Sequence, residues 1–244
     1  MTPRLTLATA GRVLTQIRHD PRTIGMLLVV PALLIGLLAW IFDDTPVFGQ
    51  VGPAMLGLFP FIVMFLVTSI TTLRERRSGT LERLLVMPLG KGDLIGGYAI
   101  AFGAIAILQA LVAVAWAVWV CGLDVAGGVW LLVLVAAVNG LLGTMLGLLA
   151  SAFAATEFQV VQFMPVIVAP QVLLGGIFLP REAMPDALQA ISDWLPLSYS
   201  IDALTRVSAE ADATGDVLGD VLVVAAFALG ALVLAALTLR RRTR

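Results

Sequence analysis

Long apolar stretches without a central charge dominate the sequence. They lie at residues 24–42, 53–73, 94–120, 129–153, 160–179 and 217–239. About 20 apolar residues in a helix cross the ~30 Å hydrocarbon core of a bilayer, and a charge at the centre of such a helix costs about 2.5–3.5 kcal/mol. Only the last stretch carries an acid, Asp220, which lies near its start. The pattern predicts six membrane-spanning helices.

The composition agrees with this interpretation and excludes two other classes. Hydrophobic residues make up 60% of the 244 positions, 23 more are glycine, and only 13% are charged. Soluble domains carry about 25% charged residues, so neither a soluble globular protein nor a disordered chain fits. We expect an all-α integral membrane protein that forms one transmembrane domain over residues 1–244. The 19-residue first stretch is too long for a cleaved signal peptide, and we expect it to remain as an anchor.

Basic and acidic residues collect on opposite sides of the six stretches. All but two of the fifteen lysines and arginines precede the first stretch, join the second to the third, or follow the last. These are Arg4, Arg12, Arg18, Arg22, Arg74, Arg76, Arg77, Arg83, Lys91, Arg240, Arg241, Arg242 and Arg244. Most acids lie on the other side, from Asp43 to Asp220. The positive-inside rule then predicts that both termini are cytoplasmic. No basic soluble surface remains that would suit a nucleic acid.

Residues 5–20 have the pattern of a helix that lies along the cytoplasmic membrane interface. Ala10, Val13, Leu14 and Ile17 share one face, and we expect Arg12 to point away from it. Asp20–Pro21 should end this helix before the first span. The alternative is an ordinary frayed leader.

The link at 74–92 is too long and too patterned for a plain turn. Ser78–Gly79 should break the helix that emerges from the second span. Thr80 can then cap a short helix, with Glu82 in its first turn, that stops at Pro88. Its leucines, Leu81, Leu84 and Leu85, share one face. Such a helix docks into a partner protein or floats among the lipid headgroups, and the pattern alone favours neither.

Residues 180–216 form the largest predicted element outside the membrane. Met184 begins an apolar repeat that predicts a half-inserted helix ending near Pro196, and a second short helix is expected around 201–207. Asp202 and Arg206 are four residues apart, so we expect them to pair. The element either lines an exit or caps the bundle.

Catalytic motifs are missing from the sequence. No Walker A pattern occurs, so the chain cannot bind and split ATP by that route, and no zinc-protease, dithiol or nucleophile-elbow motif is present. We expect no cofactor or metal in this chain. The polar residues inside the spans are better explained as hydrogen-bond partners between helices than as substrate ligands. These are Gln109, Asn139, Gln162 and Gln171. Gly143-x-x-x-Gly147 predicts close helix packing, within one subunit rather than at a dimer seam.

Three motifs carry a family resemblance. The first is the run Glu75-Arg76-Arg77-Ser78-Gly79-Thr80-Leu81-Glu82-Arg83-Leu84-Leu85-Val86-Met87-Pro88. The second is Thr156-Glu157-Phe158-Gln159 with Gln162, Pro165 and Pro170, and the third is Phe178-Leu179-Pro180-Arg181-Glu182 leading to Leu195-Pro196-Leu197-Ser198-Tyr199. Together they resemble the type-2 ATP-binding-cassette (ABC) exporter permeases, in particular the daunorubicin-resistance-like multidrug permeases.

The resemblance implies a fold and partners. Besides the six spans and the interfacial helix, it implies a cytoplasmic coupling helix and an extracellular re-entrant helical hairpin at 180–216. The coupling helix would insert into a groove of a separate ATPase subunit, which binds the ATP and the Mg. Two ATPases and two permease subunits, as a homodimer or a heterodimer, would form the exporter. The implied coupling residues are Arg74, Glu75, Arg76, Gly79, Thr80, Leu81, Glu82, Leu84, Leu85 and Pro88, and the implied substrate-path residues are Glu157, Gln159, Gln162, Pro165, Pro170 and Gln171.

The expected function is therefore the permease subunit of an exporter in the bacterial cytoplasmic membrane, without ATPase motifs of its own. Its expected cargo is a hydrophobic drug or natural product, and export of a lipid or lipid-linked glycan is the alternative within the family. A secondary transporter and a structural or sensory membrane protein are the alternatives from other classes. Only an ABC permease should co-purify with an ATPase, so that observation separates the classes.

Overall fold

The chain is all-helical over residues 2–43, 45–78 and 90–238, which are the residues that the computed structural model describes. No strand occurs within these ranges. The helices are α1 (Pro3–Arg18), α2 (Pro21–Ile41), α3 (Val47–Arg77), α5 (Lys91–Ala115), α6 (Val129–Phe153), α7 (Glu157–Leu174), α8 (Asp186–Ser192), α9 (Pro196–Ala209) and α10 (Thr214–Thr238). Helix α5 continues into a π-helical turn, η1 (Trp116–Val120), and a 3₁₀ turn, η2 (Arg181–Ala183), precedes α8.

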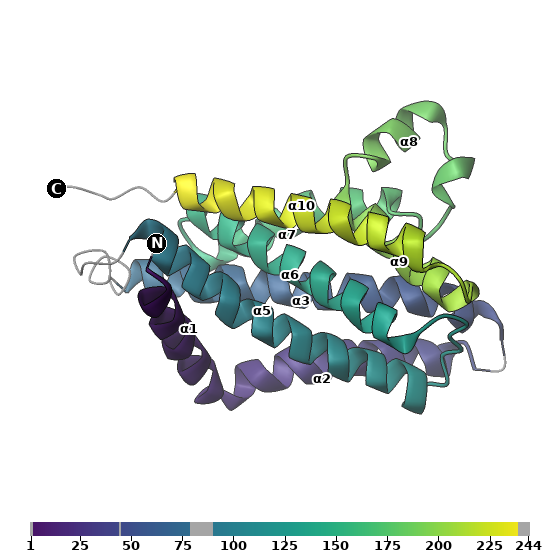
Figure 1. Cartoon of the computed structure of the whole chain (residues 1–244), viewed down its shortest axis with the longest axis horizontal. Helices are drawn as coiled ribbons and strands as arrows, with labels where there is room; N and C mark the ends of the chain where they lie inside the picture. The colour runs from purple at the N-terminus through teal and green to yellow at the C-terminus, as the bar shows by residue number, and fades with distance from the viewer. Residues whose placement is uncertain (1, 44, 79–89, 239–244) are drawn as a thin grey trace.

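Six of the described helices are long and apolar enough to cross a membrane, which confirms the predicted class. They are α2, α3, α5 with η1, α6, α7 and α10, and they run side by side (Figure 1). Helix α6 is the most enclosed of the six, since it packs against α3, α5 and α10. Helix α7 is the least enclosed. The molecule is thus one bundle built around α6.

The helix ends differ from the predicted stretches where local chemistry intervenes. Helix α3 runs from Val47 to Arg77, beyond both ends of the apolar stretch at 53–73. Helix α7 stops at Leu174, five residues before the expected end of the fifth stretch. It stops there because Gly176 adopts a left-handed backbone, with φ of 88°, that few other residues tolerate. Helix α1 ends at Arg18, just before the Asp20–Pro21 pair that the sequence predicts as its end.

Helices α3 and α6 approach each other closely at glycines. A Cβ placed on Gly147 would lie 2.6 Å from the carbonyl oxygen of Phe65, and one on Gly143 would collide with the carbonyl of Phe61. A Cβ at either position would therefore force the two helices apart. The predicted small-residue face is a packing surface within this chain.

A polar junction joins α3, α6 and α9 in the middle of the bundle. Asn139 on α6 is fully buried, and its Nδ2 donates to the carbonyl oxygen of Gly57 at 2.6 Å. Its Oδ1 accepts from the hydroxyl of Ser200 on α9 at 3.0 Å. Gln109 forms a similar link from α5, since its Nε2 donates to the Leu27 carbonyl at 2.7 Å. Both side chains are hydrogen-bond partners between helices, as predicted.

Replacing Asn139 by alanine should destabilise the bundle without preventing its assembly. The change removes both of the hydrogen bonds by which Asn139 links α6 to α3 and α9. Hydrogen bonds between membrane helices contribute about 0.6–1.7 kcal/mol each, so we expect a loss of roughly 1–3 kcal/mol in free energy of unfolding. Thermal unfolding of detergent-solubilised protein would measure it. Ala228→Gly, at another buried position but without a polar link, is the comparison.

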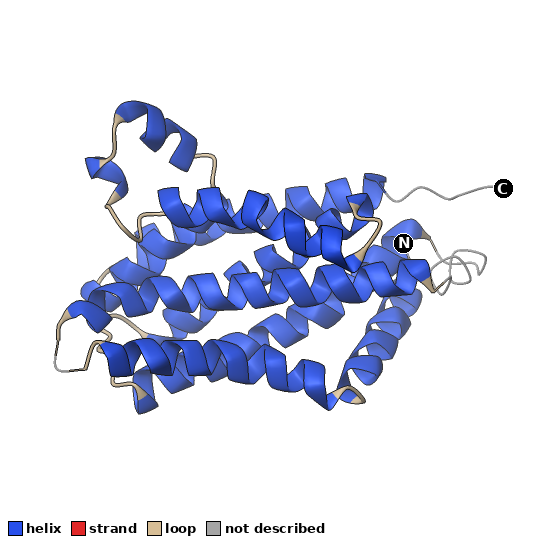
Figure 2. Ribbon diagram, turned by 180° about the vertical axis from the view of Figure 1, so that it is seen from behind, coloured by secondary structure: helices blue, strands red, loops and turns tan. Residues whose placement is uncertain are grey.

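The two ends of the bundle differ in charge. We call one of them the basic end: it holds α1, the end of α3, the start of α5 and the end of α10 (Figure 1). The other, which we call the acidic end, holds η2, α8 and the link from α9 to α10. Seen from behind, α8 stands clear of the other helices at this end (Figure 2).

Candidate functional site

At the basic end, α1 packs across the start of α5. Ala10, Val13 and Ile17 are buried there, which confirms three of the four residues of the predicted apolar face, whereas Leu14 is exposed. Close approach depends on Gly97 of α5, where a Cβ would come within 2.5 Å of the Thr9 side chain. Helix α1 is therefore fixed to the bundle by packing.

The prediction that Arg12 points away from the apolar face of its helix is wrong, because its side chain points into the bundle. Its guanidinium donates to both carboxylate oxygens of Glu75, at 3.2 and 3.0 Å. It also donates to the hydroxyl of Tyr98 at 3.1 Å, and that hydroxyl donates in turn to Glu75. Tyr98 is fully buried and Glu75 is 5% exposed. Arg12 and Tyr98 together supply the charged and hydrogen-bonding partners that a buried carboxylate needs.

A second buried carboxylate ties α1 to the start of α5. Asp93 accepts from the backbone N–H of Thr2 at 2.6 Å and from the hydroxyl of Thr6 at 3.1 Å. Its other oxygen accepts from the N–H of Gly90 at 3.2 Å. Glu75 lies in the last turn of α3 and Asp93 in the first turn of α5. Helix α1 thus binds the helices on both sides of residues 79–89.

The structure describes three of the predicted coupling residues, which are Arg74, Glu75 and Arg76. Glu75 lies in the Arg12 cluster. Arg74 pairs with Glu157 of α7 through bonds of 2.8 and 3.1 Å, and Arg76 donates to the Ser151 carbonyl at the end of α6. These arginines connect the end of α3 to α6 and α7. The other predicted coupling residues, Gly79, Thr80, Leu81, Glu82, Leu84, Leu85 and Pro88, lie outside the described residues.

The predicted substrate-path residues lie along α7, and the structure does not bring them together into one site. Glu157 binds Arg74, and the side-chain oxygen of Gln159 accepts from the N–H of Ala155 at 2.8 Å, which closes the start of the helix. Gln162, Pro165 and Pro170 are exposed. Among the residues that the structure describes, no hydrogen bond joins Gln162 to another helix.

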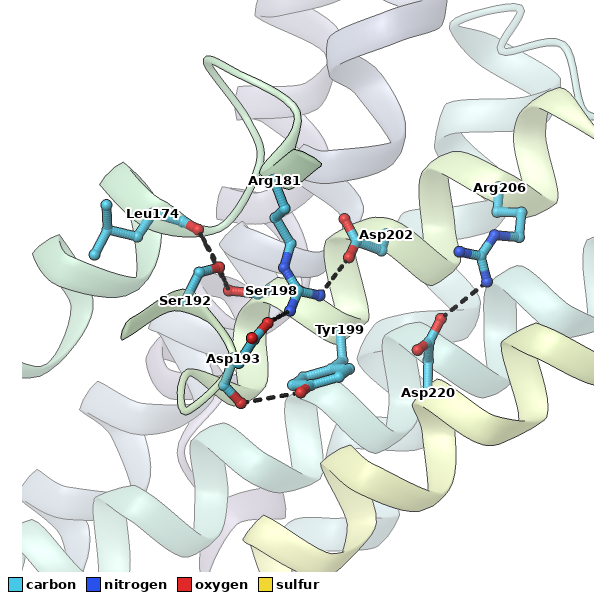
Figure 3. Close-up of polar contacts among 9 residues, drawn as sticks. All are labelled: Leu174, Arg181, Ser192, Asp193, Ser198, Tyr199, Asp202, Arg206 and Asp220. Carbon is cyan, nitrogen blue, oxygen red and sulfur yellow. Dashed lines mark hydrogen bonds and ion pairs between the residues drawn. The ribbon is translucent and has the colours of Figure 1, made fainter. Parts of the chain in front are cut away.

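Gln171 has a structural role that links α7 to α9. It is 3% exposed, and its Oε1 accepts from the N–H of Leu197 at 3.3 Å, in the first turn of α9. Pro196 and Leu195 offer no side chain that could cap this turn, so Gln171 supplies the cap from a neighbouring helix. Ser192 adds a second link, because its hydroxyl bonds to the Leu174 carbonyl at 2.7 Å and to Ser198 at 3.1 Å (Figure 3).

A cluster around Arg181 lies at the acidic end (Figure 3). The guanidinium donates to Asp202 of α9 at 2.6 Å, forms an ion pair with Asp193 and lies 4.7 Å from the ring centre of Tyr199. The hydroxyl of Tyr199 donates to the Asp193 carbonyl at 2.9 Å. Only 12% of the Arg181 side chain is exposed. One cation therefore neutralises two carboxylates from separate segments.

The expected pair of Asp202 with Arg206 does not form. Asp202 binds Arg181, while Arg206 binds Asp220 of α10 at 3.4 Å (Figure 3). Partners on other helices compete successfully with a neighbour on the same helix because they also remove the charges from an apolar surface. Helix α9 itself is longer than predicted, and α8 is shorter than the apolar repeat that begins at Met184.

The surroundings raise the pKa values of both Asp202 and Arg181. Burial raises the pKa of Asp202 above its usual value, although the nearby Arg181 acts in the opposite direction. Burial by itself would lower the pKa of Arg181, but its bonds to Asp202 and Asp193 outweigh that effect and raise it, so the guanidinium stays charged. The cluster is a structural ion pair with one carboxylate that is easier to protonate than usual.

Some of these groups carry no recognisable signal in the sequence. Arg12 lies on α1 whereas Tyr98 and Asp93 lie on α5, and nothing in the sequence spacing indicates that α1 contacts these two residues. Arg181 offers a weak signal, since it is one of only two basic residues among many acids on its side of the spans. Because so few basic residues lie among these acids, Arg181 is a natural ion-pair partner for one of them.

Six spanning helices, an additional helix packed across the basic end and a folded segment before the last span define a polytopic helical membrane protein. The residues that the structure describes contain no group of three or more His, Cys, Asp or Glu side chains placed to hold a metal ion. The chain belongs to the ABC-2 type transporter family, which it matches over residues 4–208.

Individual relatives agree with this assignment. The chain is 30% identical over 155 residues to the Escherichia coli K12 protein named "Probable multidrug ABC transporter permease YbhR", covering 64% of this chain and 42% of that protein. It is 26% identical over 158 residues to the linearmycin resistance permease protein LnrN of Bacillus subtilis, covering 65% and 41%. A third match, 21% identical over 155 residues, is the ABC transporter G family member 20 of Dictyostelium discoideum, covering 64% and 21%. The matched region spans about two fifths of the length of the two bacterial relatives.

Proposed function

We propose that this chain is the permease subunit of an ATP-driven exporter. The observation that carries the proposal is the run from Glu75 to Pro88, which matches the signature of type-2 ABC permeases and whose first residue is held by Arg12 and Tyr98. The names of the bacterial relatives, which are a multidrug and a linearmycin resistance permease, support a hydrophobic drug or natural product as cargo.

The basic end faces the cytoplasm in this proposal, and the membrane is a bacterial cytoplasmic membrane. The charge distribution supports this orientation, because all described arginines except Arg181 and Arg206 lie at or near the basic end. The acidic end then faces outward. Both termini are cytoplasmic.

The energy source lies in a partner. The chain has no Walker A motif, so we infer that it is not itself an ATPase and that ATP and Mg bind to a separate ATPase subunit. Two ATPases and a second permease subunit complete the complex. The leucines Leu81, Leu84 and Leu85 supply the apolar contact with the ATPase, because they share one face of the expected coupling helix.

The contacts at the basic end suggest how a movement of the coupling segment reaches the membrane. A displacement of residues 79–89 acts on α3 and α5 together, because α1 is bound to Glu75 on one side and to Asp93 on the other. Helix α3 carries the displacement to α7 through Arg74 and to the middle of the bundle through Gly57 and Asn139. Asn139 in turn contacts Ser200 of α9, which leads to the outer end.

Glu82→Lys and Gly79→Pro should uncouple ATP hydrolysis from export while leaving membrane insertion intact. The first change reverses a charge in the expected first turn of the coupling helix, and the second stiffens the break that precedes it. We expect export by reconstituted vesicles to fall by about tenfold or more, an effect that a lost interaction of about 1.4 kcal/mol already produces. ATP hydrolysis by the complex should continue.

Ala8→Lys serves as the control, because it also introduces a lysine, here on the exposed side of α1. Wild-type export by both coupling variants would show that the coupling assignment is wrong. The class itself is tested by affinity purification, in which an ABC ATPase should accompany the chain. Export that is abolished by an uncoupler and insensitive to loss of the ATPase would instead indicate a secondary transporter.

A further inference from the structure

Residues 177–195, which we call the outer hairpin, are attached to the bundle at few points. Helix α8 lies within this segment and stands away from the spanning helices (Figures 1 and 2). Of its apolar side chains only Met184 is buried, whereas Leu188, Ile191 and Trp194 are 40%, 50% and 78% exposed. Within this chain, apolar packing therefore contributes little to holding the hairpin against the bundle.

The attachments that remain are mainly polar, and Arg181 is their centre. Its guanidinium reaches Asp202 and Tyr199 on α9 and Asp193 at the end of the hairpin (Figure 3). Besides Arg181, the Ser192 hydroxyl bonds to the Leu174 carbonyl and to Ser198, and the Tyr199 hydroxyl donates to the Asp193 carbonyl. Removing Arg181 would therefore leave Asp193 and Asp202 as two facing carboxylates without their shared cation, and these repel each other.

We propose that the outer hairpin is a lid over α9 that Arg181 holds closed and that opens when the ion pairs of Arg181 break. The proposal rests on the proposed function in one respect, which is that the acidic end is the side where cargo leaves. An ionic attachment suits a segment that must open and close. It can be broken without exposing a large apolar surface, and its strength depends on the outside solution.

Protons on the outer side do not release this lid. Asp202 is faced by Arg181 and Glu182 from η2, by Arg206 on its own helix and by Asp220 on α10. Burial raises the pKa of Asp202, so it takes up a proton at a higher pH than its ordinary value of 3.8. Because the folded state favours the neutral form, protonation of this group does not lower the free energy of unfolding, but it does remove one ion pair of Arg181. Because the closed lid binds this proton more tightly than an open lid would, mild acid should leave the lid closed.

Hydrogen exchange of the chain in lipid nanodiscs tests the lid directly. In Arg181→Ala, the backbone amides of 181–195 should exchange about tenfold faster than in the wild type, because local opening determines their protection. Arg181→Lys should lie between the two, because lysine keeps the charge but not the fork that binds two carboxylates.

Arg206→Ala is the matched control, since it removes the neighbouring arginine that binds Asp220 and not the hairpin. Its exchange in 181–195 should equal that of the wild type. Equal exchange in Arg181→Ala and the wild type, or an equal rise in Arg206→Ala, would overturn the proposal. A rise that extends to the amides of α6 would also overturn it, because it would mean general loosening of the bundle.

ATP-driven export by the complex gives an independent result. Arg181→Ala should change the export rate while the ATPase rate changes less, because the lid lies far from the ATPase. If the exchange results hold but no ATPase supports export, the proposed function fails and the lid stands. If the lid opens in Arg181→Ala and export is unchanged, the role of the lid in cargo release is wrong.

Discussion

Gly143→Val is expected to leave no folded permease in the membrane. A Cβ at this position collides with the carbonyl group of Phe61 on α3. Overpacking costs about 1–3 kcal/mol where side chains can shift, but here the obstacle is backbone, which can move only if two helices separate. Because α6 is the most enclosed spanning helix, that separation opens the centre of the bundle. Size-exclusion chromatography of detergent extracts should show aggregate or no protein.

The control for this prediction is Gly230→Val on α10. A Cβ on Gly230 would meet no neighbouring atom within 4 Å among the described residues, so the added side chain enters open space. Gly143→Ala should give an intermediate result, with folded protein that melts at a lower temperature. If Gly143→Val instead yields folded, monomeric protein of wild-type stability, the glycines belong to a seam between subunits and the packing of α3 on α6 is wrong.

The membrane fold follows from the sequence because one physical effect dominates it. A charge inside a bilayer is so costly that the uncharged stretches mark the spans, and all six coincide with helices. The helix ends depend on smaller effects. Leu174 ends α7 because of a local backbone conformation at Gly176, and Val47 begins α3 six residues before the predicted stretch.

The polar clusters could not be predicted in the same way. Helical spacing placed the apolar face of α1 correctly at Ala10 and Val13, yet spacing alone cannot show that a buried Glu75 lies beside Arg12. Likewise, the Asp202–Arg206 spacing is favourable within a helix, but Arg181 and Asp220 come from other segments and form stronger contacts. Partners distant in sequence are decided by tertiary packing, which a single sequence does not reveal.

Arg12→Glu is expected to abolish export and leave ATP hydrolysis, which is the second large effect. It places a second carboxylate against Glu75, whose side chain is 6% exposed. Removing one partner of a buried ion pair costs about 3–5 kcal/mol, so α1 should detach from the end of α3. The coupling segment would then move without carrying α3 and α5 together. Parallel assays of ATP hydrolysis and export in vesicles would show the split.

A charge exchange separates this explanation from simple misfolding. The double variant Arg12→Glu, Glu75→Arg restores opposite charges at the same two positions, and export should recover in part because Tyr98 can still bond to either residue. Arg18→Glu reverses a charge on the exposed side of α1 and should export normally. If the double variant exports no better than Arg12→Glu although it is folded, the identity of Glu75 matters beyond its pairing with α1.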